Sequence, residues 1–230
     1  MDYLTYPFNI NKIYSTTGMD NINTTDPSIK PLSSPRDWIT YPYPIVYEYN
    51  SRGFRDKEWP SNLDDVVWCL GDSFTKGVGV PFDNTWPSIL QSQTKKRCIN
   101  LGIDGAANRL ILNIAKQIVF EYNPKYMIIM WSYPNRRYKD PWKFIHYDPS
   151  ATDNDNTKDF VNCFSSINTL LPNIYNTVVP LTYKLPVKNL YKYKVLDRGR
   201  DGHHFGYLTA ETIVDSIMQH FNFKRYDNEL

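Results

Sequence analysis

The segment VVWCLGDS, residues 66–73, gives the clearest indication of the architecture of this 230-residue chain. Its first five residues form an unbroken apolar run, which is typical of a strand buried on both faces of a parallel sheet. The run leads directly into Gly71-Asp72-Ser73, where the strand should end and a helix should begin. Glycine permits the tight turn that this change of direction requires. The stretch therefore predicts a serine at the carboxyl edge of a buried sheet, although a serine there can also be a simple helix cap.

The same alternation of strand and helix continues along the chain. Apolar runs predict further strands near residues 98–101, 126–131, 178–181 and 193–196. Helices are expected near 86–93, 110–119, 160–175 and 208–221, and the polar stretch 148–158 is expected to be a loop. Alternating strands and helices imply a parallel sheet that is covered on both faces. We therefore expect an α/β protein, a three-layer α/β/α sandwich of the flavodoxin-like type with a mainly parallel central sheet.

The first 60 residues differ in character from the rest. They are polar, rich in Pro, Asn, Ser and Thr, and show little periodicity. This pattern predicts an irregular N-terminal arm, residues 1–60, packed on or beside the domain formed by residues 61–230. Alternation at residues 46–49 predicts one short strand within the arm.

Composition limits the classes of function. The chain has 26 basic and 24 acidic residues, so neither nucleic acid nor an anionic membrane is expected as a main partner. Three scattered cysteines, Cys69, Cys98 and Cys163, argue against a disulfide framework and a zinc site. Neither a membrane-spanning stretch nor a signal peptide is visible. We expect a soluble protein that is made in the cytoplasm and uses no metal or organic cofactor.

A second polar segment, Arg200–Gly206, precedes the last predicted helix. A nucleophilic serine needs a base, and the base needs a carboxylate to orient it. The three-residue spacing of Asp201 and His204 lets both side chains reach one side of a turn. These residues form a candidate triad with Ser73, while the adjacent His203 is a rival base because it lies closer to Asp201 in sequence.

Two further loops offer donors for an oxyanion, whose stabilisation is often the largest catalytic contribution. In Asn100–Gly105, a glycine N–H can approach a substrate without interference from a side chain. In Trp131–Asn135, the asparagine amide can donate. Taken singly, each segment is also compatible with a plain loop.

Together these segments resemble the SGNH/GDSL hydrolase superfamily, which includes esterases, lipases, thioesterases and carbohydrate acetylesterases. The resemblance covers residue 66 to the C-terminus. It rests on LGDSFTKGVGV (70–80), NTWPSIL (84–90), NLGIDGAAN (100–108) and DGHHFG (201–206). Upstream, NSRGFRD (50–56) is similar to a prelude found before this domain, including in SGNH-like proteins of bacteriophages, so a phage-encoded protein is one expectation.

The resemblance implies roles for particular residues. Ser73 is the nucleophile and an oxyanion donor through its N–H group, and Gly105 is a second donor. Asp201 and His204 match the closing DxxH block, which favours His204 over His203 as the base.

The third block departs from the usual GxND pattern and reads SYPNRR, residues 132–137. Asn135 is the natural match for the oxyanion asparagine, and Asn108 is the alternative. Arg136 and Arg137 follow it and suit the binding of an anionic substrate group, although such a pair is also common on solvated surfaces.

The expected reaction is hydrolysis of an acyl or acetyl ester through an acyl-enzyme on Ser73. The substrate would be a small molecule or a carbohydrate ester. One alternative is an O-acyltransferase that uses the same triad. Another is a binding or structural module that keeps the fold without turnover. A dinucleotide-binding protein is disfavoured because no GxGxxG follows the first strand of the domain.

Overall fold

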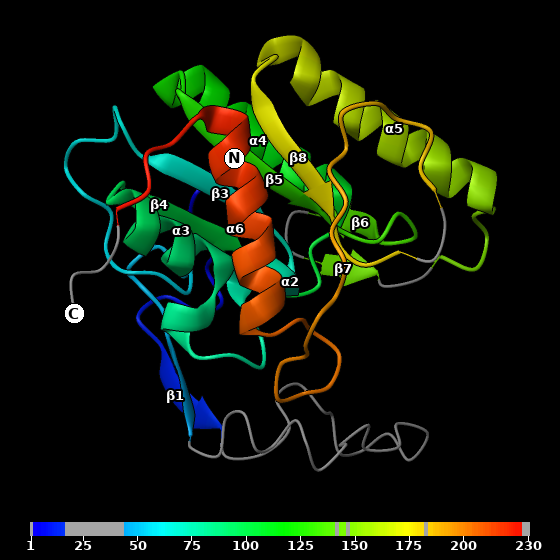
Figure 1. Cartoon of the computed structure of the whole chain (residues 1–230). Helices are drawn as coiled ribbons and strands as arrows, with labels where there is room; N and C mark the ends of the chain where they lie inside the picture. The colour runs from blue at the N-terminus through cyan, green and yellow to red at the C-terminus, as the bar shows by residue number, and fades with distance from the viewer. Residues whose placement is uncertain (1, 17–43, 141–142, 146–147, 182–183, 227–230) are drawn as a thin grey trace.

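The computed structural model describes residues 2–16, 44–140, 143–145, 148–181 and 184–226, with only the backbone described at 138–140 and 143–145. A parallel sheet of four strands forms its centre, in the order β4-β3-β5-β8 (Figure 1). The strands are β3 (Val67–Gly71), β4 (Cys98–Gly102), β5 (Tyr126–Trp131) and β8 (Ile174–Val178). Every residue of β3 is buried, as its apolar run predicts.

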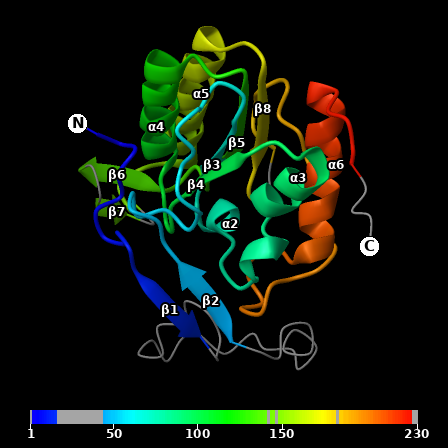
Figure 2. The same cartoon turned by 90° about the vertical axis from the view of Figure 1, so that its left-hand side faces the viewer.

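Helices cover both faces of this sheet. Helices α3 (Trp86–Thr94) and α6 (Tyr207–Phe221) pack together on one face, and α4 (Asn108–Tyr122) and α5 (Asp153–Leu170) on the other (Figure 2). The short helix α2 (Ser73–Lys76) leaves the end of β3, and a 3₁₀ turn, η1 (Phe82–Asn84), precedes α3. The expected three-layer α/β/α sandwich is therefore confirmed. Within the described residues, no helix combines the length and the apolar character needed to cross a membrane.

The polar stretch 148–158 is not a loop throughout, which corrects the expectation from sequence. Helix α5 begins at Asp153, because Thr152 and Asp155 form a capping box. The Thr152 hydroxyl accepts from the backbone N–H of Asp155, whose carboxylate accepts from the backbone N–H of Thr152. Acidic residues in the first turn also suit the positive end of the helix dipole. Polarity here marks the start of a helix.

The strand expected at 193–196 is absent from the described residues. The neighbouring residue Tyr191 forms only an isolated parallel bridge with Thr177 of β8. Beyond it, the backbone N–H groups of Leu196 and Asp197 donate to the hydroxyl of Thr209 in α6. Because these two backbone N–H groups are bound by a side chain of α6, the segment packs against that helix and adds no strand to the sheet.

The described parts of the N-terminal arm pack against the domain. Strands β1 (Ile13–Thr16) and β2 (Ile45–Glu48) pair antiparallel, and β2 overlaps the strand expected at 46–49. Leu4 and Phe54 belong to the main hydrophobic core. A second antiparallel pair, β6 (Arg137–Asp140) and β7 (Lys143–Ile145), follows β5. The rest of the arm, residues 17–43, lies outside the described residues.

Candidate active site

The turn that carries Ser73 is built around a glycine. A Cβ atom on Gly71 would lie 2.1 Å from Thr75 Oγ1 and 2.8 Å from the carbonyl oxygen of Met130. Side chains are therefore excluded at this position, and the chain can turn sharply from β3 into α2. Asp72 then caps the helix, since its carboxylate accepts from the backbone N–H of Phe74 at 3.0 Å. Ser73 is left at the first helical position, at the carboxyl edge of the sheet.

The structure brings Ser73, His204 and Asp201 into one hydrogen-bonded chain. Ser73 Oγ lies 2.8 Å from His204 Nε2, although the two residues are 131 positions apart in sequence. On the other side of the ring, His204 Nδ1 is hydrogen-bonded to the Asp201 carboxylate. Of the two candidate bases, His204 is the one whose ring contacts both Ser73 and Asp201, whereas His203 donates its backbone N–H to Asp201 Oδ1 at 3.1 Å.

Asp201 is held as a carboxylate. Burial by itself disfavours its charge, but hydrogen bonds from the His204 ring and from the backbone N–H groups of His203 and His204 outweigh that effect. The result is a pKa below the ordinary value for an aspartate. A fixed negative charge at Nδ1 suits an imidazole that must accept a proton at Nε2.

Aromatic packing fixes the plane of the His204 ring. Phe74, the residue after the serine, has its ring centroid 4.5 Å from that of His204. Phe205 packs on the same phenyl ring at 5.4 Å. The segment after Ser73 and the segment around His204 therefore support each other directly.

Besides Ser73, the predicted oxyanion donors are Gly105 and Asn135, which lie in the loops that follow β4 and β5. The backbone N–H groups of Ser73 and Gly105 make no hydrogen bond with another described residue. Gly105 is buried and has a φ of 72°, a left-handed conformation that favours glycine. Asn135 is half-buried in the loop after β5.

Asn108 has a different task. Its amide donates to the carbonyl of Ser132 at 3.1 Å, and its side-chain oxygen accepts from the Ser132 N–H at 2.8 Å. It thereby ties the start of α4 to the loop that carries Asn135. Because its polar atoms are engaged in this way, Asn108 is a poor substitute for Asn135 as an oxyanion donor.

The two arginines predicted to bind substrate are engaged by the protein. Arg136 donates to the buried carboxylate of Asp72 at 2.7 Å and to Ser132 Oγ at 2.8 Å. Arg137 donates to the carbonyl of Pro134 at 2.8 Å and to the side chain of Asn156. Sequence reasoning missed the pairing of Arg136 with Asp72, and the available signal was the departure of this block from the GxND pattern.

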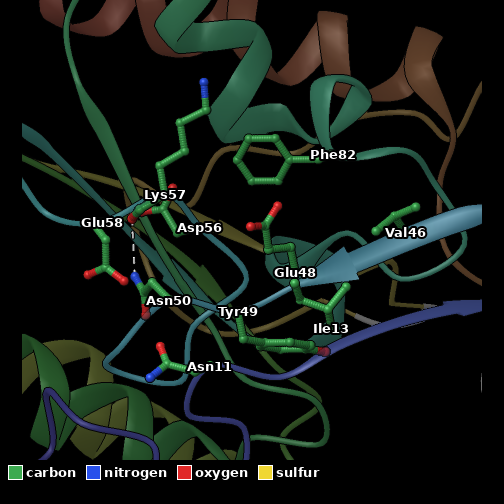
Figure 3. Close-up of a pocket in the computed structure, with 10 residues that line it drawn as sticks. All are labelled: Asn11, Ile13, Val46, Glu48, Tyr49, Asn50, Asp56, Lys57, Glu58 and Phe82. Carbon is green, nitrogen blue, oxygen red and sulfur yellow. Dashed lines mark hydrogen bonds between the residues drawn. The ribbon is translucent and has the colours of Figure 1, made fainter.

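A cavity with a volume of about 490 Å³ is lined by residues outside the triad. Figure 3 shows Val46 and Glu48 of β2 and the Phe82 ring around it. Tyr47, between those two residues of β2, points to the opposite face, where its hydroxyl accepts from the Gly79 N–H at 2.9 Å. Gly79 in turn touches Asp201, whose Oδ1 would lie 3.0 Å from an added Cβ. The cavity and the triad therefore lie on opposite sides of β2.

Comparisons with known proteins give matches only at the level of structure. No protein-family model and no curated protein sequence matches the chain. A protein described as a GDSL-like lipase, from Bacteroides ovatus, is 13% identical with a TM-score of 0.47. The match covers 74% of this chain and 58% of that protein, so the chain spans less than two thirds of it.

Two further structures carry related descriptions. A lipolytic protein of the G-D-S-L family from Desulfitobacterium hafniense is 17% identical, with a TM-score of 0.37, over 70% of this chain and 75% of its own. AlinE4, an SGNH-hydrolase family esterase, is 15% identical, with a TM-score of 0.35, over 72% of this chain and 76% of its own. These descriptions name the superfamily that the sequence motifs resemble.

Proposed function

We propose that the chain is a serine-dependent hydrolase of ester bonds, acting on an acyl or acetyl ester of a small molecule or a carbohydrate. One observation carries the proposal, namely the hydrogen-bonded chain from Ser73 Oγ through the His204 ring to the Asp201 carboxylate. A hydroxyl, an imidazole and a buried carboxylate in this order are what nucleophilic attack on a carbonyl requires.

In the first half of the reaction, His204 Nε2 takes the Ser73 proton while Oγ attacks the ester carbonyl carbon. The negative charge that develops on the carbonyl oxygen is accepted by the N–H groups of Ser73 and Gly105 and by the Asn135 amide. The Asp201 carboxylate stabilises the imidazolium that forms. When the tetrahedral intermediate collapses, the imidazolium gives its proton to the departing alkoxide, and an alcohol leaves.

The second half repeats these steps with water. His204 removes a proton from water as its oxygen attacks the acyl carbon, and the same donors hold the second oxyanion. Collapse breaks the bond to Ser73 Oγ, which recovers a proton from His204, and the carboxylic acid is released. All proton transfers pass through one nitrogen, His204 Nε2.

The test is the hydrolysis of 4-nitrophenyl acetate by the full chain and by two serine variants. Ser73→Ala should lower kcat/KM by at least about 10³-fold, in line with the loss of a triad nucleophile. Ser165→Ala, an exposed serine in α5, should leave the rate unchanged. Equal rates for Ser73→Ala and the parent chain would refute the proposal.

A further inference from the structure

Lys76 is a buried cation one turn after the candidate nucleophile. It is the last residue of α2, and its side chain is only 6% exposed. Lysine is rarely buried to this extent, because removal of an ammonium group from water is costly unless partners compensate for it. We therefore expect groups that compensate for burial to lie around the Lys76 ammonium group. Neither Lys76 nor these groups take part in the proton transfers of the proposed reaction.

The partners come from two distant parts of the chain. Lys76 Nζ lies 3.6 Å from Asp104 Oδ2, in the loop after β4. It also lies 5.7 Å and 5.6 Å from the ring centroids of Tyr47 and Tyr49, in the arm. Aromatic faces attract a cation, and this attraction is larger where the cation is desolvated. The buried ammonium group thus faces two tyrosine rings and the carboxylate of Asp104, whose side chain is 45% exposed.

Asp104 directly precedes Gly105, the predicted second oxyanion donor. The loop from Gly102 to Gly105 is held at two points. At its start, a Cβ on Gly102 would lie 2.1 Å from the backbone nitrogen of Lys76, so β4 and α2 touch through their backbones. At its end, the Asp104 carboxylate faces the Lys76 ammonium group. Gly105 is the next residue along the chain after this ion pair.

A second set of bonds holds Lys76 in place. The buried Arg55 guanidinium donates to the carbonyls of Lys76 at 3.3 Å and of Val80 at 3.0 Å, on either side of the turn after α2. The hydroxyls of Tyr14 and Tyr49 are 3.0 Å apart, which links β1 to the rings around the ammonium group. The N-terminal arm therefore packs around Lys76 and keeps its side chain directed at the loop after β4.

We infer that Lys76 and Asp104 are positioning residues that hold the Gly105 N–H group in place for oxyanion stabilisation. The tyrosines of the arm pack against this ion pair. The inference rests on the proposed function, because it assigns a role within the same site. Neither residue touches the reacting atoms. Loss of the pair releases the loop, so it weakens binding of the transition state more than binding of the substrate.

The experiment is a double-mutant cycle in the full chain with Lys76→Met, Asp104→Asn and both together. Each single variant should lower kcat by about 10- to 100-fold, below the 10²–10³-fold expected for complete removal of an oxyanion donor. KM should stay within about twofold, and the double variant should be no worse than either single variant, since both break one pair. Lys76→Arg keeps the charge and should restore part of kcat.

A matched control is available at the opposite edge of the sheet. Lys96 and Asp65 form an ion pair of 2.5 Å ahead of β4 and β3. Lys96→Met and Asp65→Asn should leave kcat unchanged. Unchanged kcat in the Lys76 and Asp104 variants would overturn the inference, and so would additive losses or losses matched by the control pair.

Amide hydrogen exchange separates this inference from the proposed function, because it needs no substrate. Exchange at residues 102–106 should accelerate in Lys76→Met and stay at the parent rate in Lys96→Met. If Ser73 proves dispensable, the hydrolase proposal fails while the exchange data still report on the loop. If Ser73 is required but kcat and exchange are unchanged in Lys76→Met, the positioning role alone is wrong.

Discussion

The ion pair between Arg136 and Asp72, the residue before Ser73, gives a quantitative prediction for Arg136→Met. Asp72, the residue before Ser73, is fully buried, and the Arg136 side chain is 11% exposed. Methionine keeps much of the length of arginine but removes the charge and its donors. The variant therefore leaves the Asp72 carboxylate buried without its cation.

The magnitude follows from what remains on that carboxylate. Loss of one partner of a buried ion pair costs about 3–5 kcal/mol. Asp72 still accepts from the backbone N–H of Phe74 and from the Ser132 hydroxyl, at 3.0 Å and 2.7 Å. These bonds place the expected loss in the free energy of unfolding near the lower limit, about 3 kcal/mol. For a domain of this size, the melting temperature should fall by about 6–12 °C.

The assay is urea unfolding followed by tryptophan fluorescence, with thermal melting as a second measurement. Arg109→Met is the control, because Arg109 also pairs with an aspartate at 2.5 Å but is 56% exposed. It should cost less than about 1 kcal/mol. Adding Asp72→Asn to Arg136→Met should recover much of the loss, since no unpaired charge is then left. A loss for Arg136→Met no larger than that for Arg109→Met would show that the buried Asp72 carboxylate does not depend on Arg136.

Three further predictions concern the proposed active site and its neighbours. Asn135→Ala should lower kcat by about 10²–10³-fold with 4-nitrophenyl acetate, and a rate near that of the parent would return Asn135 to an ordinary loop residue. Gly79→Ala should lower the free energy of unfolding by about 1–2 kcal/mol, because Gly79 has a φ of 78°. It should also lower kcat, because the added Cβ would press on Asp201. A melting temperature and a turnover equal to those of the parent would contradict this prediction. The pKa of Asp201 is lowered in the folded chain, so its stabilising contribution is present above the unfolded value, about 3.9, and is lost as pH falls through the folded value. Unfolding free energies measured from pH 5 to pH 2 should therefore fall less steeply in Asp201→Asn than in the parent, and parallel curves would count against the assignment.

Elements with a strong apolar pattern could be predicted from the sequence. The strand expected at 126–131 matches β5, Tyr126–Trp131, because six consecutive residues with large apolar surfaces suit only a buried segment there. The helix expected at 208–221 differs from α6 by one residue. The serine turn after β3 was also predictable, because a buried strand that runs into glycine has to turn.

Other features depend on contacts that no local pattern encodes. The start of α5 does not follow from the polarity of residues 148–158, because a capping box is as polar as a loop. The pairing of Arg136 with Asp72 joins residues 64 positions apart. Lys76 and Asp104 meet only because α2 and the loop after β4 pack at the same sheet edge. Such pairs become visible only once the strands are placed beside each other.

In the proposed reaction, His204 activates the Ser73 hydroxyl. Covalent labelling of the serine tests this activation without any substrate. The full chain and His204→Ala are incubated with a fluorophosphonate, and the modified peptide is located by mass spectrometry. One adduct is expected, on Ser73, which forms quickly in the parent chain and is lost or greatly slowed in His204→Ala. An unmodified Ser73 in the parent chain, or equally fast labelling in both proteins, would contradict it.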